Sequence, residues 1–271
     1  MLSFFKQKAK DPAVGHELHG RASSMQLSVV GCGDAFGSGG RLQTCFHVKT
    51  GETQFLIDCG ATALIGMHRL EIDPNDVGSI VLSHLHGDHF AGLIWWIMHA
   101  KHICGRTAPL RVIGPEGTEE RYLATAELLY PGSTSFLPEF ELTFHTFYDR
   151  DCLKGEGFDV TPFEVSHPSG SLSAALRFEI GGAVLAFSGD TEWVDNLVPC
   201  SADADLFISE CYGYDGSEYY HLTWETLQSV LPRISAKKIL LTHLNEATLA
   251  NTHLIRDERI FIAEDGLVLE I

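Results

Sequence analysis

The sequence lacks paired cysteines of the kind that bind a metal ion or form the disulfide bonds of a small fold. Its seven cysteines are scattered along 271 residues, and no two of them form a Cys-x-x-Cys pair. An odd, unpaired set argues against a disulfide framework and against a zinc site built from thiolates. We therefore expect most of these cysteines to be small buried side chains of a reduced, cytoplasmic protein.

Long apolar segments and the pattern of a signal peptide are not found in this sequence either. No apolar run approaches the roughly 18–20 residues that a membrane span needs, and the longest candidate, residues 90–100, is typical of an apolar helix. The first residues have neither the apolar region nor the small-residue cleavage site of a signal peptide. Residues 1–24 show no apolar periodicity and are predicted to be a flexible N-terminal tail. Residues 25–271 are predicted to form a single domain.

Basic residues are scarce. Lys and Arg together number 19 against 36 Asp and Glu, which gives a formal net charge of −17. Proteins that bind tRNA or other large nucleic acids usually carry a basic face, so this charge argues against such partners. A small anionic substrate is still compatible with it, because two divalent cations would leave the site itself positive.

Against these absences stands one dense cluster of metal-binding side chains. Residues 84–89 read His-Leu-His-Gly-Asp-His and directly follow an apolar run. His84 and His86 point to the same face of an extended segment, and the glycine after them lets the chain turn so that the Asp-His pair faces a nearby point. Imidazole and carboxylate ligands suit Zn²⁺, or else Mn or Fe, better than Ca²⁺ or Mg²⁺. The stretch is therefore predicted to be a metal site.

Further residues of the same kind stand where later predicted strands end. These residues are His167, Asp190, Glu210 and His243. Open α/β sheets build their sites at the carboxyl ends of strands, so we expect these side chains to meet the first cluster and to complete a site for two metals. Asp58, at the end of an earlier predicted strand, is interpreted as a carboxylate that supports a ligand.

A glycine-rich loop at residues 31–40 follows the first predicted strand. It has neither the Lys-Ser/Thr ending of a P-loop nor a clean Gly-x-Gly-x-x-Gly motif, so we interpret it as a tight loop beside the site. Aromatic residues in this loop and at 212–220, among them Phe36, Tyr212 and Tyr219, either line the substrate pocket or simply pack.

Together these residues resemble the metallo-β-lactamase superfamily. Residues 84–89 match its His-x-His-x-Asp-His signature, and His167, Asp190 and His243 lie in its later metal motifs, in order. The resemblance covers residues 25–271 and implies an α/β fold, a four-layer αββα sandwich with a dinuclear metal site at one edge of the two sheets. It implies a first metal held by His84, His86 and His167, a second held by Asp88, His89 and His243, and a bridge of Asp190 and a hydroxide.

Within the superfamily the sequence is most similar to the ribonuclease Z-like branch, which includes small-molecule phosphodiesterases and arylsulfatase-like enzymes. An aspartate bridge and a histidine as last ligand mark that branch, whereas antibiotic-hydrolysing members usually have a cysteine near the position of Asp190. The branch also has a substrate-facing histidine poised by a glutamate, and the matching residues are His221 and Glu210. The basic, Gly/Pro-rich arm with which its processing ribonucleases hold tRNA is missing from the sequence, which argues against tRNA processing.

The resemblance implies a metal-dependent hydrolase, most simply with zinc, that cleaves a phosphodiester or a related small anionic ester by attack of a metal-bridging hydroxide. The predicted catalytic residues are Asp88, which orients the nucleophile, and His221, which Glu210 poises to donate a proton. The alternative for the last two is an ordinary helix cap and a surface histidine.

Other functions of the same scaffold stay open. Arylsulfatase, lactonase or thioesterase-type activities need the same two-metal site. An iron-dependent oxidoreductase or a non-catalytic metal-binding module would belong to another class, although the complete ligand set argues against the second. The branch also makes a homodimer a reasonable expectation.

Overall fold

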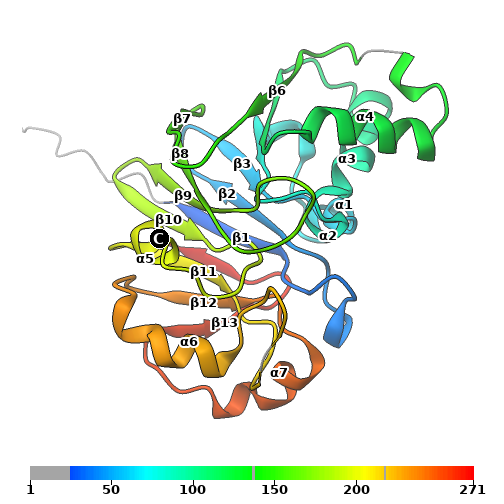
Figure 1. The fold of residues 1–271 in the computed structure, drawn as a ribbon. Helices are drawn as coiled ribbons and strands as arrows, with labels where there is room; N and C mark the ends of the chain where they lie inside the picture. Colours follow the sequence, from blue (N-terminus) through cyan, green and yellow to red (C-terminus); the bar gives the residue numbers. More distant parts are fainter. Residues whose placement is uncertain (1–24, 136–137, 217) are drawn as a thin grey trace, which may run out of the picture.

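The computed structural model describes residues 25–135, 138–216 and 218–271, and within them two seven-stranded sheets face each other (Figure 1). The predicted tail, residues 1–24, lies outside the described residues. The first sheet has the order β14-β1-β2-β3-β4-β5-β6 and consists of β1 (Gln26–Gly31), β2 (Cys45–Lys49), β3 (Gln54–Ile57), β4 (Ser79–Val81), β5 (Leu110–Gly114), β6 (Leu142–Thr146) and β14 (Val268–Glu270). The second has the order β13-β12-β11-β10-β9-β8-β7 and consists of β7 (Leu153–Lys154), β8 (Asp159–Glu164), β9 (Ala174–Ile180), β10 (Ala183–Phe187), β11 (Leu206–Glu210), β12 (Ile239–Thr242) and β13 (Ile260–Ile262).

Each sheet is antiparallel in one half and parallel in the other. Strands β14, β1, β2 and β3 pair antiparallel, and β3 to β6 run parallel. In the second sheet β7 to β10 are antiparallel and β10 to β13 parallel. Parallel neighbours need crossover connections, which explains why the longer helices lie between the parallel strands.

The helices of the first half are α1 (Ala63–Arg69), α2 (Gly87–Phe90), α3 (Gly92–His102) and α4 (Thr118–Leu129), and those of the second are α5 (Leu197–Ser201), α6 (Trp224–Val230) and α7 (Glu246–Asn251). Short 3₁₀ turns occupy Ser38–Gly40, Pro74–Asp76, Ser133–Ser135, Leu231–Arg233 and Thr252–Leu254. Within the described residues, none of the helices combines the length and the apolar character that a membrane crossing requires.

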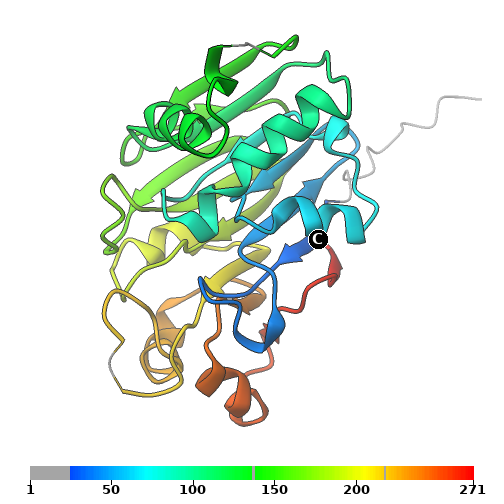
Figure 2. The ribbon, with the colours of Figure 1, turned by 90° about the vertical axis from the view of Figure 1, so that its right-hand side faces the viewer.

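Three buried apolar clusters define four layers. The central cluster lies between the sheets and includes Phe46, Phe55, Phe178 and Phe187. A second, around Trp96 and Met67, packs α1 and α3 on the outer face of the first sheet, and a third, around Phe207 and Leu227, packs α5 and α6 on the second. The turned view shows the same layering, with the cyan and teal helices covering the first sheet (Figure 2). The predicted αββα sandwich is thereby confirmed.

The local prediction around the metal motif needs one correction. The sequence pattern predicts one helix over residues 90–101, preceded by a loop, whereas the motif itself forms the short helix α2 and α3 begins after Ala91. The carbonyl oxygen of His86 accepts hydrogen bonds from the amides of His89 (3.0 Å) and Phe90 (2.9 Å), so a helical turn closes before the longer helix starts.

Two glycines let the metal motif sit directly on the end of β3. A Cβ on Gly92 would lie 2.0 Å from the carbonyl oxygen of Gly60, and a Cβ on Gly60 would lie 2.3 Å from that of Asp88. Backbone hydrogen bonds close the same contact, from the Cys59 amide to the His89 carbonyl (2.7 Å) and from the Gly92 amide to the Cys59 carbonyl (2.8 Å). This backbone-to-backbone approach leaves no room for a side chain.

We therefore expect Gly92→Ala to lower the free energy of unfolding by about 1–3 kcal/mol, because the added methyl group must push two backbone segments apart. Chemical denaturation followed by circular dichroism measures the change. Gly51→Ala is the matched control, since a Cβ at Gly51 would meet no atom within 4 Å. Equal stabilities of the two variants would show that the contact tolerates a side chain.

Candidate metal centre

The predicted ligands come together at one edge of the sandwich. The loop after β4 and helix α2 supply His84, His86, Asp88 and His89 from the first sheet. The loops after β8, β10 and β12 supply His167, Asp190 and His243 from the second. The site is therefore assembled from both sheets, as the strand-end pattern predicted.

One group consists of three histidines. The ring nitrogens of His84, His86 and His167 all lie within 4.8 Å of one another. His167 Nε2 and His86 Nδ1 are 2.9 Å apart, so both nitrogens point to the same small volume. Three imidazoles around one point form a donor set suited to zinc and related ions.

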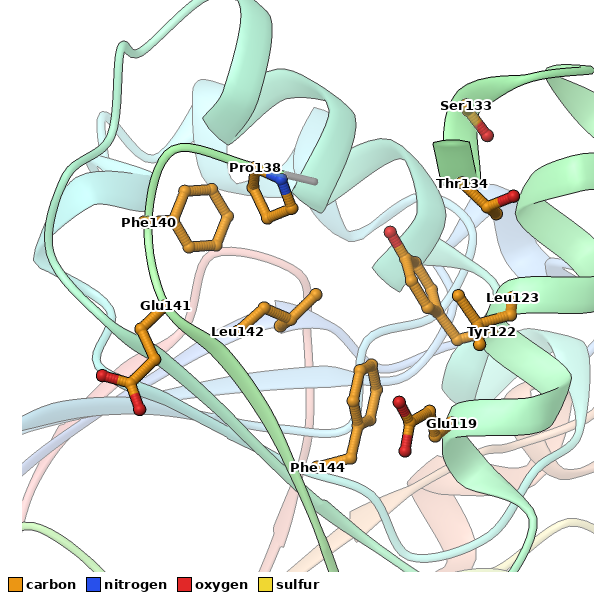
Figure 3. Close-up of a pocket in the computed structure, with 10 residues that line it drawn as sticks. All are labelled: Glu119, Tyr122, Leu123, Ser133, Thr134, Pro138, Phe140, Glu141, Leu142 and Phe144. Atoms are coloured by element: carbon orange, nitrogen blue, oxygen red, sulfur yellow. The ribbon is translucent and has the colours of Figure 1, made fainter. Parts of the chain in front are cut away.

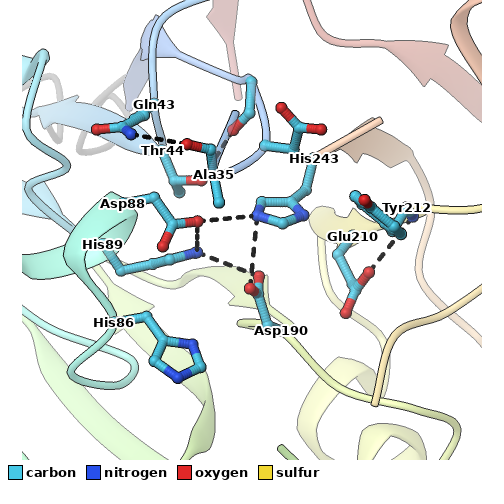
Figure 4. Close-up of polar contacts among 12 residues, drawn as sticks. Ala35, Gln43, Thr44, His86, Asp88, His89, Asp190, Glu210, Tyr212 and His243 are labelled. Atoms are coloured by element: carbon cyan, nitrogen blue, oxygen red, sulfur yellow. Dashed lines mark hydrogen bonds and ion pairs between the residues drawn. The ribbon is translucent and has the colours of Figure 1, made fainter. Parts of the chain in front are cut away.

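The second group contains two carboxylates and two histidines, all buried. The ligand atoms of Asp88, His89, Asp190 and His243 lie within 4.8 Å of one another. His243 Nε2 is 3.2 Å from Asp88 Oδ2, and His89 Nε2 is 3.2 Å from Asp190 Oδ1 (Figure 4). Burial of two carboxylates at such a short range calls for positive charge between them.

Asp190 also reaches the first group. Its Oδ2 atom is 3.8 Å from His84 Nε2 and 3.8 Å from His167 Nε2, and 3.4 Å from His243 Nε2. The carboxylate thus lies between the two donor sets, where a bridging ligand would have to be. This position supports the role that the sequence predicts for it.

The chemistry of unpaired atoms tests whether metal ions fit. Among the buried polar atoms that the structure describes, His84 Nε2, His89 Nε2 and Asp190 Oδ1 make no hydrogen bond. Buried polar atoms without partners are rare and costly, and here they converge on the same volume. Burial also lowers the pKa of His84 well below its ordinary range, which favours the neutral form that binds a metal. The residues therefore fit divalent metal ions.

Outer contacts orient the ligands. Asp58 Oδ2 lies 2.6 Å from His89 Nδ1, and the same carboxylate accepts hydrogen bonds from the amide (2.7 Å) and hydroxyl (2.8 Å) of Ser83. On the other side, His167 Nδ1 lies 2.9 Å from the carbonyl oxygen of Tyr220. Each contact leaves Nε2 of the histidine facing the centre, as such outer partners do in metal sites. Asp58 has the supporting place expected for it.

Three non-glycine residues with an unusual backbone conformation lie at the site. Asp58, Tyr220 and His243 have φ angles of 57°, 63° and 59°, in the left-handed region that non-glycine residues seldom adopt. Such conformations cost about 1–3 kcal/mol each and persist where the surroundings enforce them. Sequence reasoning missed Tyr220, because it acts through its carbonyl group, which leaves no signal in the side-chain pattern.

Glu210 and His221 form a pair at the rim of the centre. His221 Nδ1 is 3.1 Å from Oε1 of Glu210, which is completely buried and also accepts a hydrogen bond from the amide of Thr191. Burial lowers the pKa of His221, but the hydrogen bond and the charge of Glu210 outweigh it and raise this pKa to about 9. The ligand atoms of His221, His167 and Asp190 also lie within 4.8 Å of one another. Glu210 is thus no surface helix cap.

A pocket opens over the cluster. Its lining includes Asp88, Asp190 and His221 together with the aromatic residues Phe36, Tyr212 and Tyr219. Another cavity lies elsewhere, between α4 and β6, with Tyr122 and Phe144 among its lining residues (Figure 3). That second cavity contains none of the predicted ligands, so we assign the chemistry to the first.

The fold and the His/Asp cluster define a protein of the metallo-β-lactamase fold with a candidate site for divalent metal ions. More specifically, the family model of the anti-Pycsar protein Apyc1 matches residues 25–267, and the chain belongs to this family.

The relatives and solved structures to which the chain is similar include metallo-β-lactamase-fold proteins and a ribonuclease Z. The chain is 25% identical over 226 residues to the probable metallo-hydrolase YhfI of Bacillus subtilis, covering 81% of this chain and 87% of YhfI. It is 25% identical over 310 residues to ribonuclease Z of Methanosarcina acetivorans, covering 91% and 98%. The crystal structure of YhfI superposes with a TM-score of 0.76 at 22% identity over 92% of this chain and 99% of that one. A diphosphatase of the PhnP family superposes with a TM-score of 0.73 at 20% identity, covering 91% and 98%.

The proposed ligands can be tested by metal content. We expect His84→Ala to lose roughly half of the bound metal and Asp190→Ala to lose more, because only Asp190 reaches both donor groups. Inductively coupled plasma mass spectrometry of the metal-loaded variants measures this, with circular dichroism to establish folding. His253→Ala removes an exposed histidine and is the control. Full metal content in folded Asp190→Ala would contradict the bridging role.

Proposed function

We propose that the protein is a hydrolase that uses two divalent metal ions, with zinc as the first candidate, to cleave a phosphodiester or a related small anionic ester. The observation that carries this proposal is the position of Asp190 between two complete donor sets, with a histidine–glutamate pair at their rim. Two-metal sites of this kind suit hydrolysis of phosphate esters.

Each of the two groups of side chains described above would hold one metal ion. His84, His86 and His167 would hold one metal, and Asp88, His89 and His243 the other, with Asp190 shared. When bound, two such ions supply a nucleophilic hydroxide at neutral pH and stabilise the negative oxygens of the reacting ester. Asp88 contacts both His89 and His243, so its carboxylate also stands where it can orient an attacking water.

His221 is proposed to protonate the leaving group. Glu210 holds the Nδ1 side of the ring, and its hydrogen bond and charge raise the pKa of His221. The Nε2 side is then available to donate a proton to the leaving oxygen, which is the task of a general acid. Glu210 acts through His221 and is a positioning residue.

A small substrate is proposed rather than a large nucleic acid. The net charge of −17 opposes a polyanion, and a compact anionic ester needs only the positive charge of the metal centre itself. The names of relatives point to related chemistry, since they include ribonuclease Z and a diphosphatase. The cytoplasmic location and the homodimer stay predictions.

A turnover screen tests the reaction class. We expect the zinc- or manganese-loaded protein to hydrolyse bis-aryl phosphodiesters or cyclic nucleotides faster than aryl sulfates, lactones or thioesters. Asp190→Ala serves as the inactive control, and metal analysis of protein purified without added zinc tests the iron-dependent alternative. Turnover of lactones or thioesters alone would replace the phosphodiesterase assignment.

The acid role of His221 is tested by the leaving group. We expect His221→Gln to slow turnover by about 10²–10⁴-fold for an ester with an alkoxide leaving group. The loss should be much smaller for a p-nitrophenolate leaving group, because that group departs without a proton. Metal content should stay at the wild-type level. A fall in metal content would instead identify His221 as a ligand, and equal losses for both esters would remove its acid role.

A further inference from the structure

The connection between β1 and β2 is longer than these strands need. The two strands are antiparallel neighbours, which usually need about two to five connecting residues, yet residues 32–44 separate them. Long loops in compact domains are often functional. This loop, which contains the glycine-rich stretch of the sequence, lies over the metal centre and supplies Phe36 to the pocket.

A buried carboxylate fixes the tip of the loop. Asp34 is 1% exposed, and its Oδ1 atom accepts hydrogen bonds from the amides of Phe36 (3.2 Å) and Ser38 (2.8 Å). Its Oδ2 atom accepts a third from the hydroxyl of Ser38 (2.7 Å). Gly37 follows Phe36 with a φ of 71°, a conformation that glycine adopts without strain. The backbone on both sides of Phe36 is therefore held in one conformation.

Two further side chains tie the loop to the body of the protein. Gln43 Nε2 donates to the carbonyl oxygen of Ala35 (3.1 Å), and its Oε1 accepts from the amide of Ala61 (2.9 Å) (Figure 4). Glu246, at the start of α7, accepts from the amide of Gly39 (2.8 Å). The loop is thus pinned to elements of both halves of the chain.

This rigid loop holds an exposed aromatic ring at the mouth of the site. Phe36 is 86% exposed, and Tyr219, from the loop after β11, is 85% exposed. Both line the pocket that contains Asp88 and Asp190. A ring on a fixed backbone loses little conformational entropy when a ligand stacks on it, which makes such residues effective binding surfaces.

The other lining residues indicate what kind of group would bind there. Among the described residues that line the pocket, none is Lys or Arg, and Glu218 adds a carboxylate near the rim. Outside the metal centre the pocket therefore offers aromatic faces and negative charge. These surfaces suit a flat, uncharged ring and disfavour a second anionic group.

We infer that Phe36 and Tyr219 determine substrate specificity by stacking on a flat aromatic group of the ester while its phosphate lies at the metal centre. The inference rests on the proposed function and narrows it to esters that carry an aromatic ring on the side retained after cleavage. The long loop, its buried anchor Asp34 and the exposure of both rings are then parts of one binding surface.

The test compares two esters with the same leaving group, phenyl p-nitrophenyl phosphate and methyl p-nitrophenyl phosphate. In the metal-loaded wild type the phenyl ester should have the higher kcat/KM. Phe36→Ala should lower the phenyl-to-methyl ratio of kcat/KM by about 10-fold, mainly through KM, since one aromatic stacking contact is lost. Phe36→Trp should keep the ratio, Phe36→Leu should not, and Tyr219→Ala should lower it as well.

Tyr148→Ala, which removes a ring that is 56% exposed and lies outside the pocket lining, is the matched control. An unchanged ratio in both Phe36→Ala and Tyr219→Ala would overturn the inference. So would a change in oligomeric mass on light scattering of Phe36→Ala, because the ring would then belong to an interface between chains.

Failure of the proposed function gives a different result. If wild-type protein hydrolyses neither ester, turnover of these esters does not support the proposed function, but equilibrium binding still tests the stacking surface. Calorimetry with diphenyl phosphate and dimethyl phosphate should then show tighter binding of the diphenyl compound in the wild type and a smaller difference in Phe36→Ala. Equal affinities in the wild type would overturn the inference by itself.

Discussion

The site depends on buried carboxylates that have no lysine or arginine as an ionic partner among the residues that the structure describes. Asp58, Asp88, Asp190 and Glu210 are each at most 8% exposed, and the ionic partners recorded for them are all histidines. Burying a carboxylate is costly unless it is paired. A proton on Nε2 of His89 would place positive charge beside Asp190, but a protonated Nε2 could not bind a metal. Divalent cations would resolve this, because they would supply the positive charge and leave the imidazoles neutral.

The strained backbone at the site follows from the same constraint. The proposed ligand His243 and the supporting residues Asp58 and Tyr220 all adopt a left-handed backbone conformation beside the centre. The left-handed conformation of Tyr220 accompanies a carbonyl that faces His167 Nδ1, and that of His243 accompanies an amide that donates to the Cys32 carbonyl (3.0 Å). The cost is offset by rigid placement of the donor atoms, which metal binding rewards.

Side chains at strand ends could be predicted from the sequence, whereas backbone contacts could not. Residue type alone identifies the candidate metal ligands in the 84–89 motif and at His167, Asp190 and His243. Because all of them follow the ends of strands, they are expected to lie at the same edge of the fold. Other contacts depend on the backbone: the amide of Ser83, the carbonyl group of Tyr220 and the missing Cβ atoms of Gly60 and Gly92. Many sequences could provide these groups, so the residue types do not reveal them. The roles of Asp34 and Gln43 were hidden for a related reason, since ordinary polar residues acquire them only when the loop is folded.

The division of the site between the two sheets ties its geometry to the central core. One backbone hydrogen bond joins the Ala174 amide in β9 to the Ser83 carbonyl beside the metal motif (3.1 Å). Between the sheets, Phe46 and Phe187 pack edge to face with ring centroids 5.6 Å apart. Close-packed interiors resist compression and transmit strain, so this packing sets how far the side chains of residues 84–89 stand from His167, Asp190 and His243. Core packing between the sheets thereby controls the geometry within each donor group, because each group draws its side chains from both sheets.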